Sequence, residues 1–187
     1  MQTEKEKMLA GALYDPYDPA LAAQRAHARE LCDQLNRLGS NDRRRRAALL
    51  ALLFGAETDA AVHGSFHCDY GYNIVLGKNA YLNVDCVILD VMPVLIGANA
   101  LFGPGVHVYT ALHPMNAAER RAGLEFGKPV TIGDDVWLGG RSVVCPGVGI
   151  GAGSVIGAGS VVTRDVPAGV FAAGNPCRVV RPLPETP

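Results

Sequence analysis

The histidine side chains are the residues of this chain best suited to acid–base or metal chemistry near neutral pH. They are His27, His63, His67, His107 and His113. Only the last two fall near each other in the repeat described below, whereas a catalytic zinc ion usually takes three protein ligands. Metal catalysis is therefore disfavoured. A histidine can also act as a general base, in which a neutral imidazole removes the proton of a hydroxyl group. The ordinary alternative for a lone histidine in a loop is a structural role, with its ring bonded to the backbone.

The cysteines limit the classes of structure that the chain can adopt. They are scattered and never form a CxxC pair, so neither a disulfide scaffold nor a structural zinc site is indicated. They are Cys32, Cys68, Cys86, Cys145 and Cys177. We expect reduced, mostly buried thiols in a cytoplasmic protein.

The charge and hydropathy of the chain argue against a polymeric or membrane partner. A formal net charge of −1 over 187 residues supplies no basic field for nucleic acid or anionic lipid. No apolar run is long enough to cross a bilayer, and the first residues lack the apolar core of an export signal. The expected ligand is a small molecule, and the expected organisation is one main domain.

A period of six residues begins at about Ile74 and is the strongest structural signal in the chain. In the consecutive blocks that start at Ile132, the first residue is aliphatic and the fifth is Val or Ser. One inward branched side chain and one small inward residue per block predict short strands joined by tight, glycine-rich corners. Stacked coils of this kind bury continuous aliphatic ladders. The predicted fold class is mainly β: a left-handed parallel β-helix of hexapeptide repeats with a short N-terminal α-helical segment.

The N-terminal segment, residues 1–55, follows a helical pattern instead. Asp18 stands before a proline, as an N-cap does, and apolar residues then recur at helical spacing until Gly39. A second helix is predicted after Asp42. It starts with four arginines, residues 43–46, which oppose the helix dipole and are expected to be solvated.

The β-helix is assigned to residues 56–187, with one interruption and one tail. The repeat breaks between about residues 111 and 130, and an insertion at a corner of a solenoid must leave the coil as a loop. His113 lies in this loop. The final RPLPETP contains three prolines and is expected to extend beyond the fold.

Four stretches of the sequence resemble the hexapeptide-repeat acyltransferases, specifically the maltose, galactoside and nodulation-factor acetyltransferase group. They are EKEKMLAGALYDPYDPAL, CDYGYNIVLGKNAYLNVDC, YTALHPMNAAERRAGLEFGKPVTIGDDVWLGG and GNPCRVVR. The resemblance covers nearly the whole chain. It implies an O-acetyltransferase that uses acetyl-CoA and assembles as a homotrimer, with active sites at the subunit interfaces.

The resemblance also implies catalytic residues. His113, in the TALHP motif, matches the general base of the family, which takes the proton of a sugar hydroxyl as it attacks the thioester. Asn83 and the backbone N–H of Gly140 match positions near the thioester carbonyl, where an oxyanion develops. The alternative for Asn83 is a structural asparagine in a turn, and for Gly140 a simple corner.

The positions that match the acetyl-CoA contacts of the family combine small residues with cations. Guanidinium groups bind phosphates in a bidentate manner, which suits the nucleotide end of the cofactor. The alternative for the arginines is a solvated corner or tail. The matching residues are Asn83, Gly140, Ala158, Thr163, Arg164, Arg178 and Arg181.

The resemblance also matches residues on the acceptor side of the site, where this sequence departs from the galactoside branch at several positions. Asp69 and Asp90 match positions near the acceptor pocket, where carboxylates accept hydrogen bonds from sugar hydroxyls. Against the galactoside branch, Asp69 replaces a hydroxyl residue, Val91 replaces a second acidic residue and Pro16 replaces an N-terminal acidic residue. Asp15, beside Pro16, is a candidate substitute. The CDYGYN and LDV segments are closer to the maltose branch, which favours a glucose-type or maltose-type acceptor.

Other functions are compatible with the same fold. A chloramphenicol-type or serine-type acetyltransferase would also use a loop histidine and acetyl-CoA, and would differ in the acceptor pocket. A zinc carbonic anhydrase needs three converging histidines, which the spacing does not offer. A trimeric β-helix that serves only as a scaffold is the non-enzymatic alternative, against which His113, Asn83 and the arginines argue.

Overall fold

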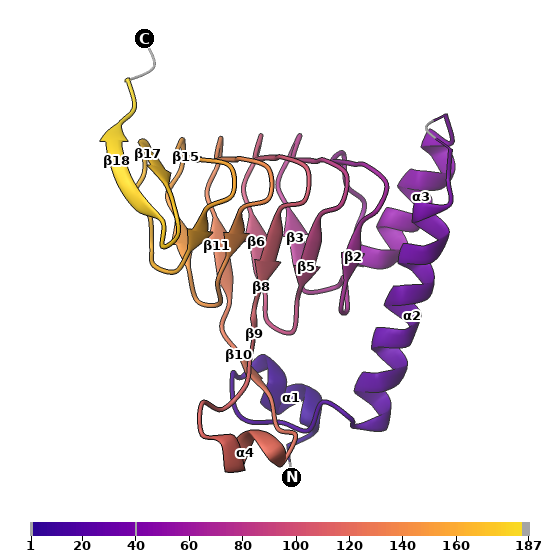
Figure 1. The fold of residues 1–187 in the computed structure, drawn as a ribbon. Coiled ribbons are helices and arrows are strands. Elements are labelled where there is room, and N and C mark those ends of the chain that lie inside the picture. Colours follow the sequence, from indigo (N-terminus) through magenta and orange to yellow (C-terminus); the bar gives the residue numbers. More distant parts are fainter. Residues whose placement is uncertain (1, 40, 185–187) are drawn as a thin grey trace.

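A computed structural model describes residues 2–39 and 41–184, and it shows helices packed at one end of a β-helix (Figure 1). Helix α1 (Glu4–Leu9) begins at a capping box formed by Thr3 and Glu6. It is followed by α2 (Pro19–Asn36) and α3 (Arg43–Phe54). The α2 helix starts where the sequence predicted, because the Asp18 carboxylate accepts the N–H groups of Ala20 and Leu21.

The arginines at the start of α3 behave in two ways. Residues 43–45 are exposed, as expected. Arg46 is partly buried, and its guanidinium donates hydrogen bonds to the carbonyls of Leu38 and Val62. The expectation of solvated arginines is therefore wrong for Arg46, which ties the α2–α3 connection to the first coil.

Short parallel strands joined by tight corners form the coil. In order they are β1 (Ala61–Val62), β2 (His67–Cys68), β3 (Ile74–Leu76), β4 (Tyr81–Leu82), β5 (Val87–Leu89), β6 (Val94–Ile96), β7 (Leu101–Phe102), β8 (His107–Tyr109), β11 (Val130–Ile132), β12 (Trp137–Leu138), β13 (Val143–Val144), β14 (Gly149–Ile150), β15 (Val155–Ile156) and β16 (Val161–Val162). Successive strands visit three sheets in turn: β1-β4-β7-β12-β15, β2-β5-β8-β13-β16 and β3-β6-β11-β14. This arrangement is a three-sided coil, which confirms the predicted parallel β-helix. Parallel pairing starts at β1, earlier than the sixfold pattern suggested.

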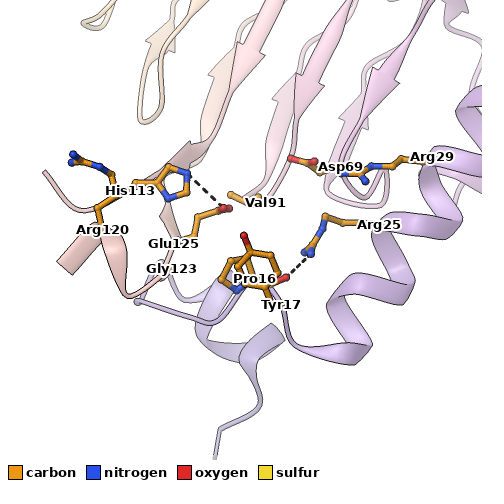
Figure 2. A pocket seen from close by; sticks show the side chains of 10 residues that line it. All are labelled: Pro16, Tyr17, Arg25, Arg29, Asp69, Val91, His113, Arg120, Gly123 and Glu125. Carbon is orange, nitrogen blue, oxygen red and sulfur yellow. Dashed lines mark hydrogen bonds and ion pairs between the residues drawn. The ribbon is translucent and has the colours of Figure 1, made fainter. Parts of the chain in front are cut away.

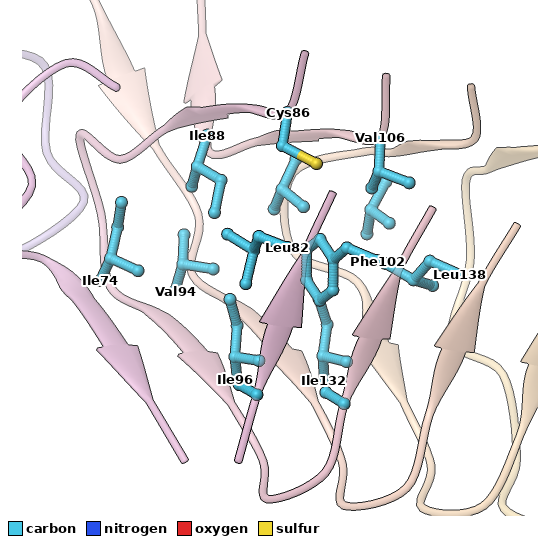
Figure 3. Close-up of a cluster of buried hydrophobic side chains, with 14 of the residues drawn as sticks. Ile74, Leu82, Cys86, Ile88, Val94, Ile96, Phe102, Val106, Ile132 and Leu138 are labelled. Carbon is cyan, nitrogen blue, oxygen red and sulfur yellow. The ribbon is translucent and has the colours of Figure 1, made fainter. Parts of the chain in front are cut away.

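The core of the coil is filled by the two inward positions of each repeat (Figure 3). Ile132 and Leu138, both first positions, are at most 2% exposed, and the fifth position Val136 is fully buried. At the corners, the absence of a side chain on glycine lets the backbone of the next coil pack closely. A Cβ at Gly97, for example, would lie only 2.5 Å from the backbone nitrogen of Asp134. The period of six therefore encodes both the aliphatic ladders and the close stacking of the corners.

The predicted loop leaves the coil and returns to it through two antiparallel strands. It leaves through β9 (Ala111–Leu112), turns through α4 (Ala117–Arg121) and returns through β10 (Phe126–Gly127), which pairs with β9. Figure 1 shows this loop beside α1, away from the rest of the coil. The loop and the N-terminal segment are joined by a β-bridge between Tyr14 and Glu125.

The C-terminal end differs from the prediction. The last strands, β17 (Val170–Ala173) and β18 (Arg178–Pro182), form an antiparallel pair at the edge of the first sheet. Leu183 also donates its N–H to the carbonyl of Gly169. The expected tail therefore starts later, since its first residues complete the edge of the sheet, and residues 185–187 lie outside the described residues.

In the two described stretches, we find no helix whose length and hydropathy together would allow it to cross a membrane.

Candidate active site

A cavity of about 430 Å³ opens where the loop, α2 and the N-terminal segment meet (Figure 2). Its walls carry charged groups of both signs and one histidine. The lining residues are Pro16, Tyr17, Arg25, Arg29, Asp69, Val91, His113, Arg120, Gly123 and Glu125. A concave site of this size with a few converging polar groups is typical of small-molecule binding.

His113 enters the cavity from the loop directly after β9. Its Nδ1 lies 3.5 Å from the carbonyl oxygen of Leu124. Because a carbonyl only accepts hydrogen bonds, this contact assigns the proton of the neutral ring to Nδ1. Nε2 then keeps its lone pair, and the side chain is 55% exposed. The geometry is that of a base available to a substrate hydroxyl.

Glu125 lies beside His113 and was not singled out from the sequence. Its Oε2 lies 4.0 Å from His113 Nε2, and its side chain is only 14% exposed. The buried Tyr14 donates a hydrogen bond of 2.5 Å to Oε1 of Glu125. Burial, and then the bond to Glu125, raise the pKa of Tyr14 well above its ordinary value, so the phenol remains a donor.

Asp69, which the resemblance matched to the acceptor pocket, lies on the cavity wall opposite His113 (Figure 2). Burial raises the pKa of its carboxyl, and the charge of Glu125 raises it further, whereas Arg25 and Arg29 act in the opposite direction. Arg25 is fixed in place: it donates to the hydroxyl of Tyr70 at 2.6 Å and to the carbonyl of Pro16. This wall of the cavity is therefore a mixed surface of carboxylates and guanidinium groups.

Asp90 does not reach the cavity, which corrects the expectation that it contacts the acceptor. It is fully buried, and its Oδ1 accepts the backbone N–H groups of Asp69 at 3.0 Å and Tyr70 at 2.9 Å. Its Oδ2 is buried without a hydrogen-bond partner, and burial raises the pKa of the carboxyl to about 7. Asp90 supports the segment that carries Asp69 and does not itself touch the cavity.

Asp15 is also absent from the lining. Its carboxylate accepts the N–H of Tyr17 at 2.8 Å, which folds it back onto its own turn. Its neighbours Pro16 and Tyr17 line the cavity instead, as does Val91. The three positions that depart from the galactoside branch, Pro16, Asp69 and Val91, therefore all line the cavity.

Asn83 and Gly140 lie at a different corner of the coil from His113. Asn83 follows β4 and Gly140 follows β12, so both occupy the turn from the first sheet to the second, whereas the loop connects the second sheet to the third. Asn83 Oδ1 accepts the N–H of Val84 at 2.8 Å, which leaves the amide nitrogen as the available donor. Ala158 shares this corner, since a Cβ at Gly139 would meet its backbone nitrogen at 2.5 Å.

The remaining residues matched to acetyl-CoA are exposed. Thr163 and Arg164 follow β16, at the corner between the second and third sheets. Arg178 and Arg181 lie on β18, where the guanidinium of Arg181 stacks 5.7 Å from the ring of Phe171. These arginines make no ion pair with a carboxylate of the described residues, so their charge is available to phosphates.

Metal ligands do not cluster in this structure. Within residues 2–39 and 41–184, no group of three or more His, Cys, Asp or Glu side chains could hold a metal ion. The cysteines are free thiols, and the nearest pair, Cys32 and Cys68, has its sulfurs 3.7 Å apart.

Comparison with known proteins decides the family. A profile of the maltose acetyltransferase hexapeptide capping motif matches residues 7–57, and one of the hexapeptide repeat of succinyl-transferase matches residues 129–164. A Saccharomyces cerevisiae protein named as an acetyltransferase is 46% identical over 182 residues, which cover 96% of this chain and 93% of that protein. This chain belongs to the hexapeptide-repeat acetyltransferase family. The family predicted from the sequence is thereby confirmed.

Solved structures of the family agree closely with this fold. A maltose O-acetyltransferase from Clostridium difficile superposes with a TM-score of 0.96 at 44% identity, covering 98% of this chain and 99% of its own. A hexapeptide-repeat acetyltransferase of Vibrio cholerae, solved with acetyl-coenzyme A, gives 0.90 at 39% identity over 98% and 100% of the two chains. A galactoside acetyltransferase solved with coenzyme A gives 0.92 at 35% identity over 98% and 92%.

Proposed function

We propose that this acetyltransferase moves the acetyl group of acetyl-CoA to a hydroxyl of a saccharide, with His113 as the general base. The observation that carries the proposal is the orientation of the ring: Nδ1 faces the carbonyl of Leu124, and Nε2 faces a cavity of small-molecule size. A hydroxyl is a weak nucleophile at neutral pH. Removal of its proton as it attacks the thioester accelerates such a reaction by roughly 10²–10⁴-fold.

The oxyanion of the tetrahedral intermediate is assigned to Asn83 and the N–H of Gly140. Both lie at a corner of the coil that the loop of the same chain does not occupy. A complete site therefore requires the His113 of one subunit and the Asn83 corner of another. This need supports the homotrimer, because closed cyclic symmetry repeats one such interface at every subunit contact.

Acetyl-CoA is the proposed acetyl donor. The family members from Vibrio cholerae and the galactoside acetyltransferase were solved with acetyl-coenzyme A and coenzyme A. In this chain, the exposed guanidinium groups of Arg164, Arg178 and Arg181 suit the phosphates of the nucleotide end. Ala158, which follows β15, and Thr163, which follows β16, lie on neighbouring corners of one turn of the coil and are assigned to the same ligand.

A saccharide is the proposed acceptor because several charged hydrogen-bonding groups line the cavity. Asp69 and Glu125 accept hydrogen bonds, and Arg25 and Arg29 donate them. The relation to the maltose O-acetyltransferase supports a glucose-type or maltose-type sugar.

The proposal is tested by following free thiol release from acetyl-CoA with glucose, maltose, a galactoside, serine and chloramphenicol as acceptors. We expect turnover with sugars and a loss of at least about 100-fold in kcat for His113→Ala. His27→Ala, which removes an exposed imidazole from α2, is the matched control and should retain full activity. Consumption of acetyl-CoA with none of the acceptors would instead support a scaffold role, and an active His113→Ala variant would exclude the general base.

A further inference from the structure

We propose that Cys32 and Cys68 are an oxidisable dithiol, and that the disulfide they form with a hydroperoxide as oxidant ties α2 to the coil and weakens acceptor binding. Neither cysteine belongs to the residues assigned above to the base, the oxyanion or acetyl-CoA. Formation of the bond is independent of the proposed function. Its effect on the acceptor rests on that function, because it concerns the cavity assigned to the acceptor.

The two thiols meet in the core where α2 packs against β2 of the first coil. Cys32 lies on the buried face of α2, and Cys68 is the inward residue of β2. Their sulfurs are 3.7 Å apart, within the range of a thiol–thiol hydrogen bond. A disulfide requires a sulfur–sulfur distance of about 2.0 Å, so a small approach separates the dithiol from the bonded form.

The other cysteines offer no such pair. Cys86 donates to the carbonyl of Gly103 at 3.6 Å, and among the described residues only Cys32 and Cys68 bring two sulfurs into contact. Cys145 is the least buried of the five thiols. Exposure alone would therefore direct an oxidant to Cys145, whereas contact between two sulfurs directs disulfide formation to Cys32 and Cys68.

The surroundings of the pair favour one sulfur as the nucleophile. The hydrogen bond from Cys68 lowers the pKa of the Cys32 thiol, because it stabilises the thiolate. The same hydrogen bond, then burial and the nearby Asp90 carboxyl, raise the pKa of Cys68 well above its ordinary value. Cys68 therefore keeps its proton and donates, and Cys32 is the sulfur that reacts with the oxidant.

The oxidation consumes one molecule of hydrogen peroxide and transfers two electrons to it. The Cys32 thiolate attacks one peroxide oxygen and the O–O bond breaks, which gives a sulfenic acid and a hydroxide that takes the proton lost by Cys32. The Cys68 sulfur then displaces the hydroxyl of the sulfenic acid, and the Cys68 proton leaves with it as a second water. Cys68 is 6% exposed, so the pair lies within reach of an oxidant little larger than water.

Each cysteine adjoins a residue that lines the cavity. Arg29 lies one turn before Cys32 on α2, and Asp69 directly follows Cys68. Burial raises the pKa of the Asp69 carboxyl, and the charge of Arg29 acts in the opposite direction. A shorter link between the sulfurs draws these two groups together, and their ion pair then occupies the carboxylate that the acceptor would use. Oxidation should raise the acceptor KM roughly 3- to 10-fold and leave the KM for acetyl-CoA unchanged.

The direct test is a peptide map of folded wild type after treatment with hydrogen peroxide and alkylation of the remaining thiols. Trypsin should release residues 30–37 joined to residues 47–78, with the loss of two hydrogen atoms, and dithiothreitol should separate them. The melting temperature of the oxidised protein should rise by about 5–10 °C, because the disulfide closes a long loop. Cys145→Ser is the matched control and should form the same link.

The kinetic arm compares oxidised and reduced protein with the best saccharide acceptor. Cys32→Ala and Cys68→Ala should each abolish both the cross-link and the effect of peroxide on the acceptor KM. Cys145→Ser should retain both, since it leaves the dithiol intact. Alanine is the replacement at the first two positions because both side chains are buried in the hydrophobic core.

The outcomes separate this proposal from the proposed function. A map in which the two peptides stay unlinked while Cys145 is oxidised would overturn the dithiol, and a link with an unchanged acceptor KM would exclude its effect on the cavity. If the link forms and the melting temperature rises, but wild type acetylates none of the sugars, the proposed function fails and the dithiol stands. Should an alanine variant fail to fold, the map of wild type and its reversal by dithiothreitol still decide.

Discussion

The stacked coils and the cavity differ in how far along the chain their contacts reach. In the coils, each strand pairs with the equivalent strand of the next turn, as Trp137 does with Val155. In the cavity, the bond that holds Glu125 comes from Tyr14, 111 residues away in sequence. The coils repeat the same pairing between neighbouring turns, whereas the cavity forms only when the N-terminal segment, α2 and the loop are packed together.

This difference separates residues that determine the fold from residues that determine the site. A change at a corner of the coil disturbs the backbone of the next turn directly. A change in the cavity wall touches side chains and loops that the coils do not need for their own packing. Substitutions in the two regions should therefore have distinct effects on stability and activity.

The largest effect on stability is expected for Gly97→Ala, at a corner of the coil. The new Cβ would lie 2.5 Å from the backbone nitrogen of Asp134 and 2.6 Å from the carbonyl carbon of Gly133, neither of which is a flexible group. We expect a loss of about 3 kcal/mol or more in the free energy of unfolding, because overpacking here moves the backbone. Chemical denaturation measures it. Gly64→Ala, where a Cβ meets nothing within 4 Å, is the control, and equal stability of the two variants would contradict close stacking.

A smaller effect is expected at the junction of the two regions, where Asp90 supports the cavity wall from inside the coil. Its pKa is raised from 3.8 to about 7 by burial, so between these values the folded protein binds a proton more tightly than the unfolded chain does. This contribution to stability is full below about pH 4 and is lost as the pH rises through 7. It amounts to about 2–3 kcal/mol between pH 5 and pH 8.

Asp90→Asn tests this assignment, because the amide does not titrate in that range. The variant should lose less stability than wild type between pH 5 and pH 8 in parallel denaturation curves. Its Oδ1 can still accept the N–H groups of Asp69 and Tyr70, so the wall is expected to keep its shape. A pH dependence identical to that of wild type would show that Asp90 is ionised in the folded protein throughout.

The regular coils could be predicted because the residues that determine the conformation of each repeat lie within that repeat. The pattern of an aliphatic first residue and a small fifth residue predicts which side chains face inward. In the structure Ile132, Val136 and Leu138 are buried, as this pattern predicts. The start of α2 could be predicted for the same reason, because Asp18 and the proline after it act within one turn of the helix. The antiparallel strand β18 was missed because its pairing with β17 follows a turn outside the sixfold pattern.

The candidate site was predictable only where a motif marked it. His113 and Asp69, both singled out by the resemblance, line one cavity, and their roles stay predictions. The sequence did not indicate a role for Glu125, Tyr14 or Arg25. Their local sequence carries no pattern that predicts contact between the N-terminal segment, α2 and the loop. The resemblance matched Asp90 to a position near the acceptor pocket, but strand alternation turns its side chain to the interior.

The smallest effect concerns the helices at the end of the coil, where two aspartates precede helices in the same way but act differently. Asp18 accepts the N–H groups of Ala20 and Leu21 at the start of α2, whereas Asp42 makes no side-chain bond to the start of α3. Asp18→Ala should therefore lower the free energy of unfolding by about 1 kcal/mol, and Asp42→Ala by much less. Thermal denaturation of the two variants measures the difference. Because α2 carries Arg25 and Arg29 into the cavity, Asp18→Ala should also raise the acceptor KM slightly, and equal effects of both substitutions would contradict a specific capping role.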